Sequence, residues 1–364
     1  MKLALFSESG GRGNDTAHVS YAEDLFEIVT ADRLGFEEVW VAERGSRSRG
    51  QSPDIVSAAN LLICKAAAMT ERIRLGTGIR PLPYHHPFTV ATEATVCDHL
   101  TGGRYMLGYG GTHGVYGDHN LQLGIEPAVQ RAMAYEAIDY IMRCFTAEDA
   151  FDFDGEFWHG TGINILPKPL QKPYPPIAAA CSGSLETIEV AAHNGFIALF
   201  GRGGDPAHRI KQMGDCYMEA ARGAGRQASR NLFRVVHYVY VSDSVHQAKD
   251  ELRTTMEPAL ERQKRGQHWE GLSRWLPEGG TIQDVTFDYL VEAGRYFVGD
   301  PDTVYEAIRD FYFASGGFGV LMLLAAQGHT SRDNWERSME LLAEHVMPKL
   351  AELDPDRDFA EATA

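Results

Sequence analysis

The stretch that decides the fold is residues 73–109, IRLGTGIRPLPYHHPFTVATEATVCDHLTGGRYMLGY. It begins with a short β-rich run at residues 73–77 and ends with a second apolar run at residues 105–109. Between them, Pro87 stands at the first position of a helical pattern that stops before Gly102-Gly103. A strand, a helix and a second strand at this spacing predict two parallel strands joined by a crossover helix.

The same unit repeats along the chain, and the number of repeats predicts the architecture. Eight β-rich runs are each followed by a helical pattern, the number of units that closes a (β/α)8 TIM barrel. The alternative, an open doubly wound sheet, usually carries a GxGxxG motif after its first strand, whereas this chain has GGRG at residues 10–13. We therefore predict an α/β TIM barrel. The predicted strands are residues 3–6, 38–42, 73–77, 105–109, 176–180, 196–200, 233–241 and 319–324.

Two segments depart from the repeat. Residues 148–166 alternate around a turn at Asp154-Gly155, which predicts a hairpin after the fourth helix. Residues 261–297, after the seventh strand and its helix, are irregular and rich in Gly, Gln and Trp. We predict one barrel domain over residues 1–353 that contains this insertion, followed by a frayed tail over residues 354–364.

Composition disfavours several classes of protein. The 364 residues include 34 Lys+Arg and 50 Asp+Glu, for a net charge of -16. A chain this acidic is a poor partner for nucleic acid or an anionic membrane, and we find no apolar run long enough to span a bilayer. The five cysteines are widely spaced and form no CxxC pair, which is not typical of a disulfide framework. We expect a cytoplasmic protein with free thiols.

In barrel enzymes the active-site residues lie on the loops that follow the strands. Here those loops contain His85, His86, His113 and His119. A zinc site is disfavoured because there is no HExxH motif and because neighbours on an extended segment point in opposite directions, so we expect no metal. A functional histidine and a loop histidine bonded to backbone are about equally good interpretations of His85 and His86.

Two further loops have the composition of an anion site. Residues 181–184 (CSGS) follow the fifth strand and open a helix, and residues 201–204 (GRGG) follow the sixth. Hydroxyls and backbone N–H groups at a helix start, with a cationic side chain nearby, are the ingredients of a phosphate site. The alternative is that both loops only turn the chain and that Arg202 is a solvated surface residue. For Cys181, packing is the stronger interpretation over a nucleophilic role.

Several motifs, taken as a set, resemble one family. They are MKLALF (1–6), LGFEEVWVAE (34–43), RIRLGTGIRPLPYHHPF (72–88), LTGGRYMLGYGGT (100–112), PIAAACSGS (176–184), VGDPDTVYEAIRDF (298–311), GVLMLLAA (319–326) and MELLAEHVMPKL (339–350). Through this set the chain resembles the bacterial-luciferase-like family of flavin-dependent monooxygenases, with the luciferase and diketocamphane types nearest. A similar branch of the family binds a deazaflavin and transfers a hydride instead.

The resemblance implies a barrel whose insertion, at residues 261–297, acts as a mobile lid. It also implies a two-component monooxygenase that receives reduced flavin mononucleotide (FMN) from a separate NAD(P)H-dependent flavin reductase, in a transient encounter. With O2 the flavin would form a peroxide that oxygenates a small organic substrate, by a Baeyer–Villiger-type reaction or by hydroxylation. Trp269, Leu272 and Trp275 in the insertion favour an apolar substrate. We expect a homodimer.

Individual residues can be carried over from the family motifs. The resemblance implies a non-proline cis peptide at Gly78-Ile79 under the flavin ring, and it places His86 near the flavin. Ser182 and Ser184 would lie at the phosphate with Arg202. The predicted cofactor-binding residues are Gly78, Ile79, Tyr109, Ser182, Ser184, Phe200 and Arg202, and the predicted catalytic residues are His86, His113 and Arg44.

The chain departs from the family pattern at two positions. Luciferase and diketocamphane types carry His directly after the Glu of the second strand, where this chain has Arg44, and luciferase has Cys-Arg where this chain has Tyr109-Gly110. An arginine cannot act as a base near pH 7, but it can stabilise developing negative charge.

Two alternative functions remain open. One is a deazaflavin-dependent oxidoreductase on the same barrel, and the other is an inactive flavin-binding protein. FMN is favoured over a deazaflavin because the long anionic tail of a deazaflavin calls for several Lys or Arg side chains, and this chain is acidic.

Overall fold

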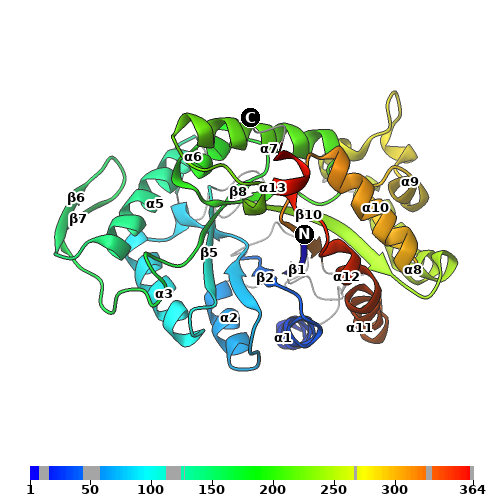
Figure 1. Ribbon diagram of the computed structural model, residues 1–364, viewed down its shortest axis with the longest axis horizontal. Helices are drawn as coiled ribbons and strands as arrows, with labels where there is room; N and C mark the ends of the chain where they lie inside the picture. The colour runs from blue at the N-terminus through cyan, green and yellow to red at the C-terminus, as the bar shows by residue number, and fades with distance from the viewer. Residues whose placement is uncertain are drawn as a thin grey trace. The chain divides into compact units, whose positions relative to one another are not determined.

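The computed structural model describes residues 1–7, 16–43, 58–111, 124–126, 128–265, 269–324 and 330–360. The chain divides into two compact units, which are described one at a time. The N-terminal unit comprises Ser7–Asp32 and Glu37–Ala180. The C-terminal unit comprises Met1–Phe6, Arg33–Phe36 and Cys181–Ala364. Figure 1 shows strands and helices alternating along the chain in both units.

In the described part of the N-terminal unit, four strands pair in parallel, in the order β2, β3, β5 and β8. They are β2 (Glu38–Val41), β3 (Arg74–Thr77), β5 (Tyr105–Gly110) and β8 (Ile177–Cys181), and the short strand β4 (Arg80–Pro81) also pairs with β5. In register, Val39 is opposite Leu75, and Leu107 is opposite Ile177. All residues of β2 and β5 are buried, as expected for parallel strands covered on both faces.

Close packing explains the glycines of this sheet. The Trp40 ring of β2 is fully buried and lies across the neighbouring strands. A Cβ atom at Gly76 would overlap this ring, and a Cβ at Gly108 would overlap the Thr77 carbonyl oxygen. The Thr77 hydroxyl donates to the Gly108 carbonyl at 2.8 Å. Glycine is therefore required at residue 76 by the indole ring and at residue 108 by the backbone of β3.

The helices of this unit follow the strands, and a hairpin interrupts the repeat. The helices are α1 (Ala17–Leu34), α2 (Ala59–Ala67), the one-turn η1 (Leu82–Tyr84), α3 (Pro87–Leu100) and α5 (Gln130–Thr146). After α5, β6 (Phe151–Asp154) and β7 (His159–Ile163) pair antiparallel, which confirms the predicted hairpin. Glu136 of α5 accepts from the backbone N–H groups of Phe157 and Trp158 and so ties the hairpin turn to the helix.

The C-terminal unit is built around one long strand. The strand β10 (Phe233–Val241) pairs in parallel with β9 (Ile197–Phe200), β11 (Tyr296–Gly299) and β12 (Val320–Leu324), and β12 pairs with β1 (Lys2–Ser7). In register, Val235 is opposite Leu321, which is itself opposite Leu3. All three side chains are buried, so the core of this unit continues through the sheet.

Helices and single turns connect these strands. They are α6 (Leu185–Asn194), α7 (Ala207–Gly223), η2 (Arg230–Leu232), α8 (Val245–Arg265), η3 (Trp269–Trp275), η4 (Ile282–Asp284), α9 (Phe287–Glu292), α10 (Pro301–Ala314), α11 (Arg332–Leu341), the π-turn η5 (Leu342–Val346), α12 (Met347–Leu350) and α13 (Pro355–Asp358). Ser184 caps α6 and Asp300 caps α10, each accepting from the backbone N–H three residues later. The cap at Ser184 lies in the segment that the sequence predicts to open a helix.

All eight predicted strands are present, as β1, β2, β3, β5, β8, β9, β10 and β12, and the structure adds three corrections. The segment 261–297 is not wholly irregular, because it contains η4 and α9 and ends in β11. β11 has only four residues, and its burial depends on pairing with β10, a contact that no local pattern encodes. In the sequence, Thr330 and Asp333 fit the pattern of a capping box, but in the structure Ser331 caps α11 by accepting from Asn334. Finally, the helical pattern that follows the eighth predicted strand, over residues 330–350, is interrupted by the π-turn.

The C-terminal residues are packed as far as the structure describes them. Asp356 accepts from the Ser229 hydroxyl and from the Arg230 backbone N–H, and Tyr312 donates to Asp358. The expected fraying from residue 354 is therefore not seen through residue 360. Within the described ranges, no helix is both long enough and apolar enough to cross a membrane.

Candidate active site

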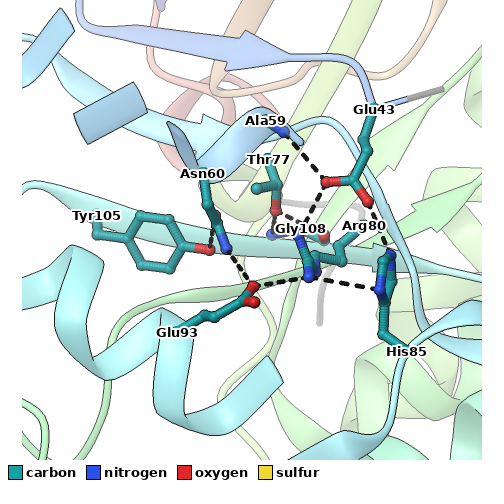
Figure 2. A network of polar contacts seen from close by, with 9 residues as sticks. All are labelled: Glu43, Ala59, Asn60, Thr77, Arg80, His85, Glu93, Tyr105 and Gly108. Carbon is teal, nitrogen blue, oxygen red and sulfur yellow. Dashed lines mark hydrogen bonds and ion pairs between the residues drawn. The ribbon is translucent and has the colours of Figure 1, made fainter. Parts of the chain in front are cut away.

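A cluster of charged side chains lies where β2 and β3 end (Figure 2). We call Glu43, Arg80, His85 and Glu93 the charged cluster. Glu43, two residues after β2, is only 2% exposed, and the Arg80 side chain is 5% exposed. Oε2 of Glu43 accepts from Arg80 Nη1 at 3.0 Å and from the Ala59 N–H at 3.2 Å. Arg80 therefore pairs with a carboxylate that is withdrawn from solvent.

The second carboxylate on Arg80 comes from helix α3. Arg80 Nη2 lies 2.7 Å from Oε2 of Glu93, and Asn60 donates to the same carboxylate at 3.2 Å. Tyr105, in turn, donates to Asn60 at 2.8 Å. One guanidinium thus lies between two carboxylates, so that the three groups together carry a net negative charge. A cation near them would be stabilised.

His85 completes the charged cluster. Its Nε2 lies 2.9 Å from Oε1 of Glu43, and its Nδ1 lies 3.5 Å from Arg80 Nη2, at the long limit of a hydrogen bond. Because Glu43 already accepts from Arg80, we assign the proton to Nε2 and the lone pair to Nδ1. A partly exposed imidazole that is oriented by a carboxylate can take up or release a proton at its other nitrogen.

The backbone between β3 and η1 brings these side chains together. The Gly78–Ile79 peptide bond is cis, as the family resemblance implies, and the Gly78 N–H donates to the Val41 carbonyl at 2.7 Å. Arg80 then enters β4 opposite Tyr109. Whether Gly78, Ile79 and the buried Tyr109 contact a cofactor stays a prediction.

His86 has different surroundings from His85. It is the N-cap of α3, and its Nδ1 accepts from the Phe88 N–H at 3.2 Å. The exposed ring lies edge-on to Tyr140 and Trp158, at centroid distances of 5.9 and 5.4 Å. These contacts are those of a loop histidine bonded to backbone, and a catalytic role for His86 stays a prediction. The other two predicted catalytic residues, Arg44 and His113, lie outside the described residues.

The C-terminal unit contains the two loops predicted to bind phosphate. After β8, Ser184 accepts from the Thr187 N–H at 3.4 Å to cap α6. Arg209 of α7 donates to the Ser182 carbonyl at 3.0 Å, and it lies 3.6 Å from Asp205. The arginine thus joins this loop to the one that follows β9.

The loop after β9 is rich in glycine, and it contains Arg202 with two further arginines nearby. Gly203 has φ +80°, and a Cβ atom there would overlap the Leu324 side chain, so the position requires glycine. The Arg202 N–H donates to Asp205 at 2.9 Å, and Arg274 donates to the Arg202 carbonyl at 3.1 Å. Desolvation, together with the positive charges of Arg274 and Arg209, lowers the pKa of the Arg202 guanidinium.

The remaining candidates in this unit belong to the core. Phe200 is fully buried, with its ring centroid 4.9 Å from that of Phe233, and a contact between Phe200 and a flavin stays a prediction. Cys181 is also fully buried, and this burial raises the pKa of its thiol. That environment fits the packing interpretation of Cys181 and not a nucleophile. Among the described residues, no group of three or more His, Cys, Asp or Glu side chains is arranged to hold a metal ion.

Sequence reasoning does not assign Glu43, Arg80, Glu93 and Arg274 to a site. Glu43 and Arg80 do lie on loops predicted to follow strands, which is the only signal for them. Their pairing spans 37 residues, and the sequence contains no pattern that specifies it. Glu93 lies inside a helical pattern, where a glutamate is ordinarily solvated.

Comparison with known proteins extends this description. The family model described as luciferase-like monooxygenase matches residues 1–318. A 4-hydroxyprotoasukamycin monooxygenase from Streptomyces nodosus subsp. asukaensis is 33% identical over 335 residues, which cover 91% of this chain and 87% of that protein.

Two solved structures bear on the fold. One is the oxygenating constituent of 3,6-diketocamphane monooxygenase from Pseudomonas putida, a type II Baeyer–Villiger monooxygenase in complex with FMN. Its TM-score is 0.83 at 24% identity, covering 96% of this chain and 98% of that chain. The other is the coenzyme F420-dependent tetrahydromethanopterin reductase from Methanopyrus kandleri, with a TM-score of 0.68 at 16% identity, covering 96% and 99%.

These likenesses confirm the predicted fold class, an α/β barrel of eight parallel strands surrounded by helices. The relative with 33% identity is a named monooxygenase, and the match to the family extends over most of the sequence. This chain belongs to the luciferase-like monooxygenase family.

Proposed function

We propose that this protein is the oxygenase component of a two-component monooxygenase that uses reduced FMN and O2 to oxygenate a small apolar organic substrate. The observation that carries the proposal is the loop Gly201–Arg202–Gly203–Gly204, in which Arg202 stands among three glycines of positive φ and has Arg209 and Arg274 nearby. Bound FMN would supply the electrons that place one atom of O2 in the substrate and release the other as water.

The phosphate would bind at this loop through Arg202. Among the described residues, the Arg202 guanidinium has no hydrogen-bond partner, whereas Arg209 and Arg274 each donate to a backbone carbonyl of the two loops. Ser182 and Ser184 add hydroxyl groups at the start of α6, where backbone N–H groups also favour an anion. One available guanidinium matches the single phosphate of FMN.

Proton transfer would depend on His85. The Glu43 carboxylate holds the Nε2 proton of His85 at 2.9 Å, and the contact of Nδ1 with Arg80 Nη2 is long, at 3.5 Å. Nδ1 would exchange this long contact for a substrate proton during the reaction. Arg80 pairs with Glu43 at 3.0 Å and so holds the carboxylate in place beside His85. His86 and His113 remain further candidates for the same role, whereas Arg44 remains a candidate for stabilising developing negative charge.

The second candidate function is hydride transfer with a deazaflavin. It is favoured by the likeness to a coenzyme F420-dependent reductase. The two functions differ in the cofactor that binds, so equilibrium titration with reduced FMN and with reduced deazaflavin separates them. Tight binding of the deazaflavin alone would overturn the FMN proposal.

The oxygenase function is tested by reconstitution. The protein is mixed with a flavin reductase, NADH, FMN and a panel of apolar ketones and alkenes, and products are detected by the mass of one added oxygen atom. His85→Gln should lower product formation by on the order of 100-fold while the affinity for reduced FMN is unchanged. An unchanged product yield would remove His85 from the mechanism, and no product from the unmodified protein with any substrate would contradict the oxygenase function.

The same proposal includes a flavin reductase as the partner and a homodimer as the assembly. A transient encounter with the reductase predicts that free reduced FMN, generated behind a dialysis membrane, supports turnover. Analytical ultracentrifugation tests the expected homodimer.

A further inference from the structure

Two cysteines face each other across the packed helices α2 and α3. The Sγ atoms of Cys64 and Cys97 are 3.5 Å apart, at hydrogen-bond distance for thiols. Cys97 is buried, whereas Cys64 is partly exposed. The Cys64 sulfur is therefore accessible to a small solute, and the Cys97 sulfur lies close enough to bond with it.

Helices α2 and α3 make a second contact, one helical turn closer to their N-termini. Asn60 precedes Cys64 by four residues, Glu93 precedes Cys97 by four residues, and Asn60 donates to Glu93 at 3.2 Å. Because residues four apart lie on one face of a helix, the two pairs are successive contacts across a single interface. Glu93 is also the residue that binds Arg80 at 2.7 Å, as Figure 2 shows. The cysteine pair is thus one helical turn from the charged cluster.

The thiol pair differs chemically from the other cysteines of the chain. The hydrogen bond between the two thiols lowers the pKa of Cys64 and raises that of Cys97. Burial raises the pKa of Cys144 to about 11, and it also raises the pKa values of Cys181 and Cys216. Cys64 is the cysteine most prepared to react as a thiolate.

We propose that Cys64 and Cys97 form a reversible disulfide when the protein meets hydrogen peroxide, and that this modification disturbs the charged cluster. The Cys64 thiolate attacks one peroxide oxygen, the O–O bond breaks, and Cys64 becomes a sulfenic acid while hydroxide leaves and takes up a proton. The Cys97 thiol then loses its proton and attacks the Cys64 sulfur, so that the S–S bond forms and a second water leaves. Two thiols lose two electrons, and one peroxide is reduced to two waters.

Bond formation requires the two sulfurs to approach each other, through rotation of the side chains and through movement of one helix against the other. The sulfurs have to close from 3.5 Å to about 2 Å, the length of a disulfide bond. Since α2 and α3 are regular at these positions, the movement extends to the Asn60–Glu93 contact one turn away. Oxidation is therefore expected to change how Glu93 holds Arg80. This last step concerns the site of the proposed function, whereas the disulfide itself does not depend on it.

The disulfide is tested on the full-length reduced protein. After brief treatment with a small excess of hydrogen peroxide, the intact mass should fall by two hydrogen atoms, and titratable thiols should fall from five to three. Peptide mapping should then join the segments that contain Cys64 and Cys97, and dithiothreitol should restore five thiols. Stable sulfinic acid at Cys64, or a bridge that involves any other cysteine, would overturn the proposal.

Variants supply the matched control. Cys64→Ser should abolish the loss of two hydrogens, and Cys216→Ser should retain it. If Cys64→Ser lost the bridge only because it failed to fold, its circular dichroism would show this, and the peptide map of the unmodified protein would still decide the proposal. Coupling to the charged cluster is measured as the fall in unfolding temperature caused by Glu93→Gln, which should differ between the reduced and the oxidised Cys216→Ser protein and should be the same before and after peroxide in Cys64→Ser. Equal falls in the reduced and the oxidised Cys216→Ser protein would overturn the coupling. This readout needs no turnover, so its failure is distinct from failure of the proposed function.

Discussion

Glu43 accepts hydrogen bonds from groups on three separate segments, namely Ala59 at the start of α2, Arg80 in β4 and His85 after η1. Desolvation of a carboxylate is costly, so a buried glutamate is tolerated only with such partners. Its role is to hold the positions of Arg80 and His85.

Removing this carboxylate should destabilise the fold. Glu43→Ala leaves Arg80 in its buried position with Glu93 as its remaining partner, and the free energy of unfolding should fall by about 3 kcal/mol. Urea denaturation followed by circular dichroism measures the loss. The control is Glu336→Ala, which breaks an exposed pair with Arg33 and should cost less than about 1 kcal/mol. Equal losses in the two variants would contradict a structural role for the Glu43–Arg80 pair.

Arg202 is the residue on which the phosphate assignment depends. Arg202→Ala should weaken the binding of reduced FMN by about 1.5–3 kcal/mol, the usual loss of a charge-assisted hydrogen bond and on the order of 10- to 100-fold in Kd. Anaerobic fluorescence titration measures the change. Arg265→Ala, at a side chain that is 82% exposed, serves as the matched control. If both variants bind as the unmodified protein does, Arg202 is a solvated surface residue.

At the scale of the element, helix α3 depends on its first residues. His86 accepts from the Phe88 N–H and stands before Pro87 at the first helical position. His86→Ala should lower the free energy of unfolding by about 1 kcal/mol because the cap is lost, and His86→Asn should restore most of it. Thermal denaturation of both variants makes this comparison.

The same variants decide between the two interpretations of His86. If His86 acts only as the cap of α3, the amount of product formed per bound flavin is unchanged in both variants. A fall of ~100-fold in both, with an increase in released hydrogen peroxide, would instead make His86 an acid or base in the reaction.

The pairing of β10 with β11 should make the fold sensitive to acid. His237 of β10 is fully buried and stacks on Phe297 of β11 at a centroid distance of 3.9 Å, and burial lowers the pKa of His237 to about 4. Between pH 6.5 and 4 the unfolded chain binds a proton that the folded protein does not, so this group lowers stability as the pH falls through that window. Above pH 6.5 the penalty is absent.

This acid sensitivity can be assigned by substitution. The penalty should reach about 3 kcal/mol near pH 4, since each pKa unit is worth about 1.4 kcal/mol. Urea denaturation from pH 7.5 to 4 measures it, and His237→Gln, although less stable throughout, should show a shallower loss of stability. Parallel pH profiles for the two proteins would assign the sensitivity to other groups.

For the whole molecule, the proposed dependence on a reductase predicts a preference between the redox states of the cofactor. The protein should bind reduced FMN more tightly than oxidised FMN, because a component that receives its flavin reduced has to retain that form. Titration under nitrogen, compared with titration in air, measures the two constants. Tight binding of oxidised FMN together with direct oxidation of NADPH would contradict the two-component arrangement.

Much of the fold is determined by local signals in the sequence. The α3 helix begins at Pro87 and ends at Leu100, as the proline at its first position and the Gly102-Gly103 stop predict. The eight strands are found because apolar periodicity needs only a few neighbouring residues to be visible. The cis bond at Gly78-Ile79 is implied by the family resemblance, and the structure contains it. Two of the three predicted catalytic residues, Arg44 and His113, lie outside the described residues.

The polar contacts that matter for the site were decided by the tertiary structure alone. Glu43 and Arg80 are separated by 37 residues, and Asn60 and Glu93 by 33 residues, as are Cys64 and Cys97. No local pattern distinguishes a buried, paired glutamate from a solvated one, because its partners come from other strands and helices. The same holds for β11, which is a strand because β10 is beside it. Periodicity and capping act within about one turn of a helix, whereas desolvation and charge pairing depend on which distant segments the fold brings together.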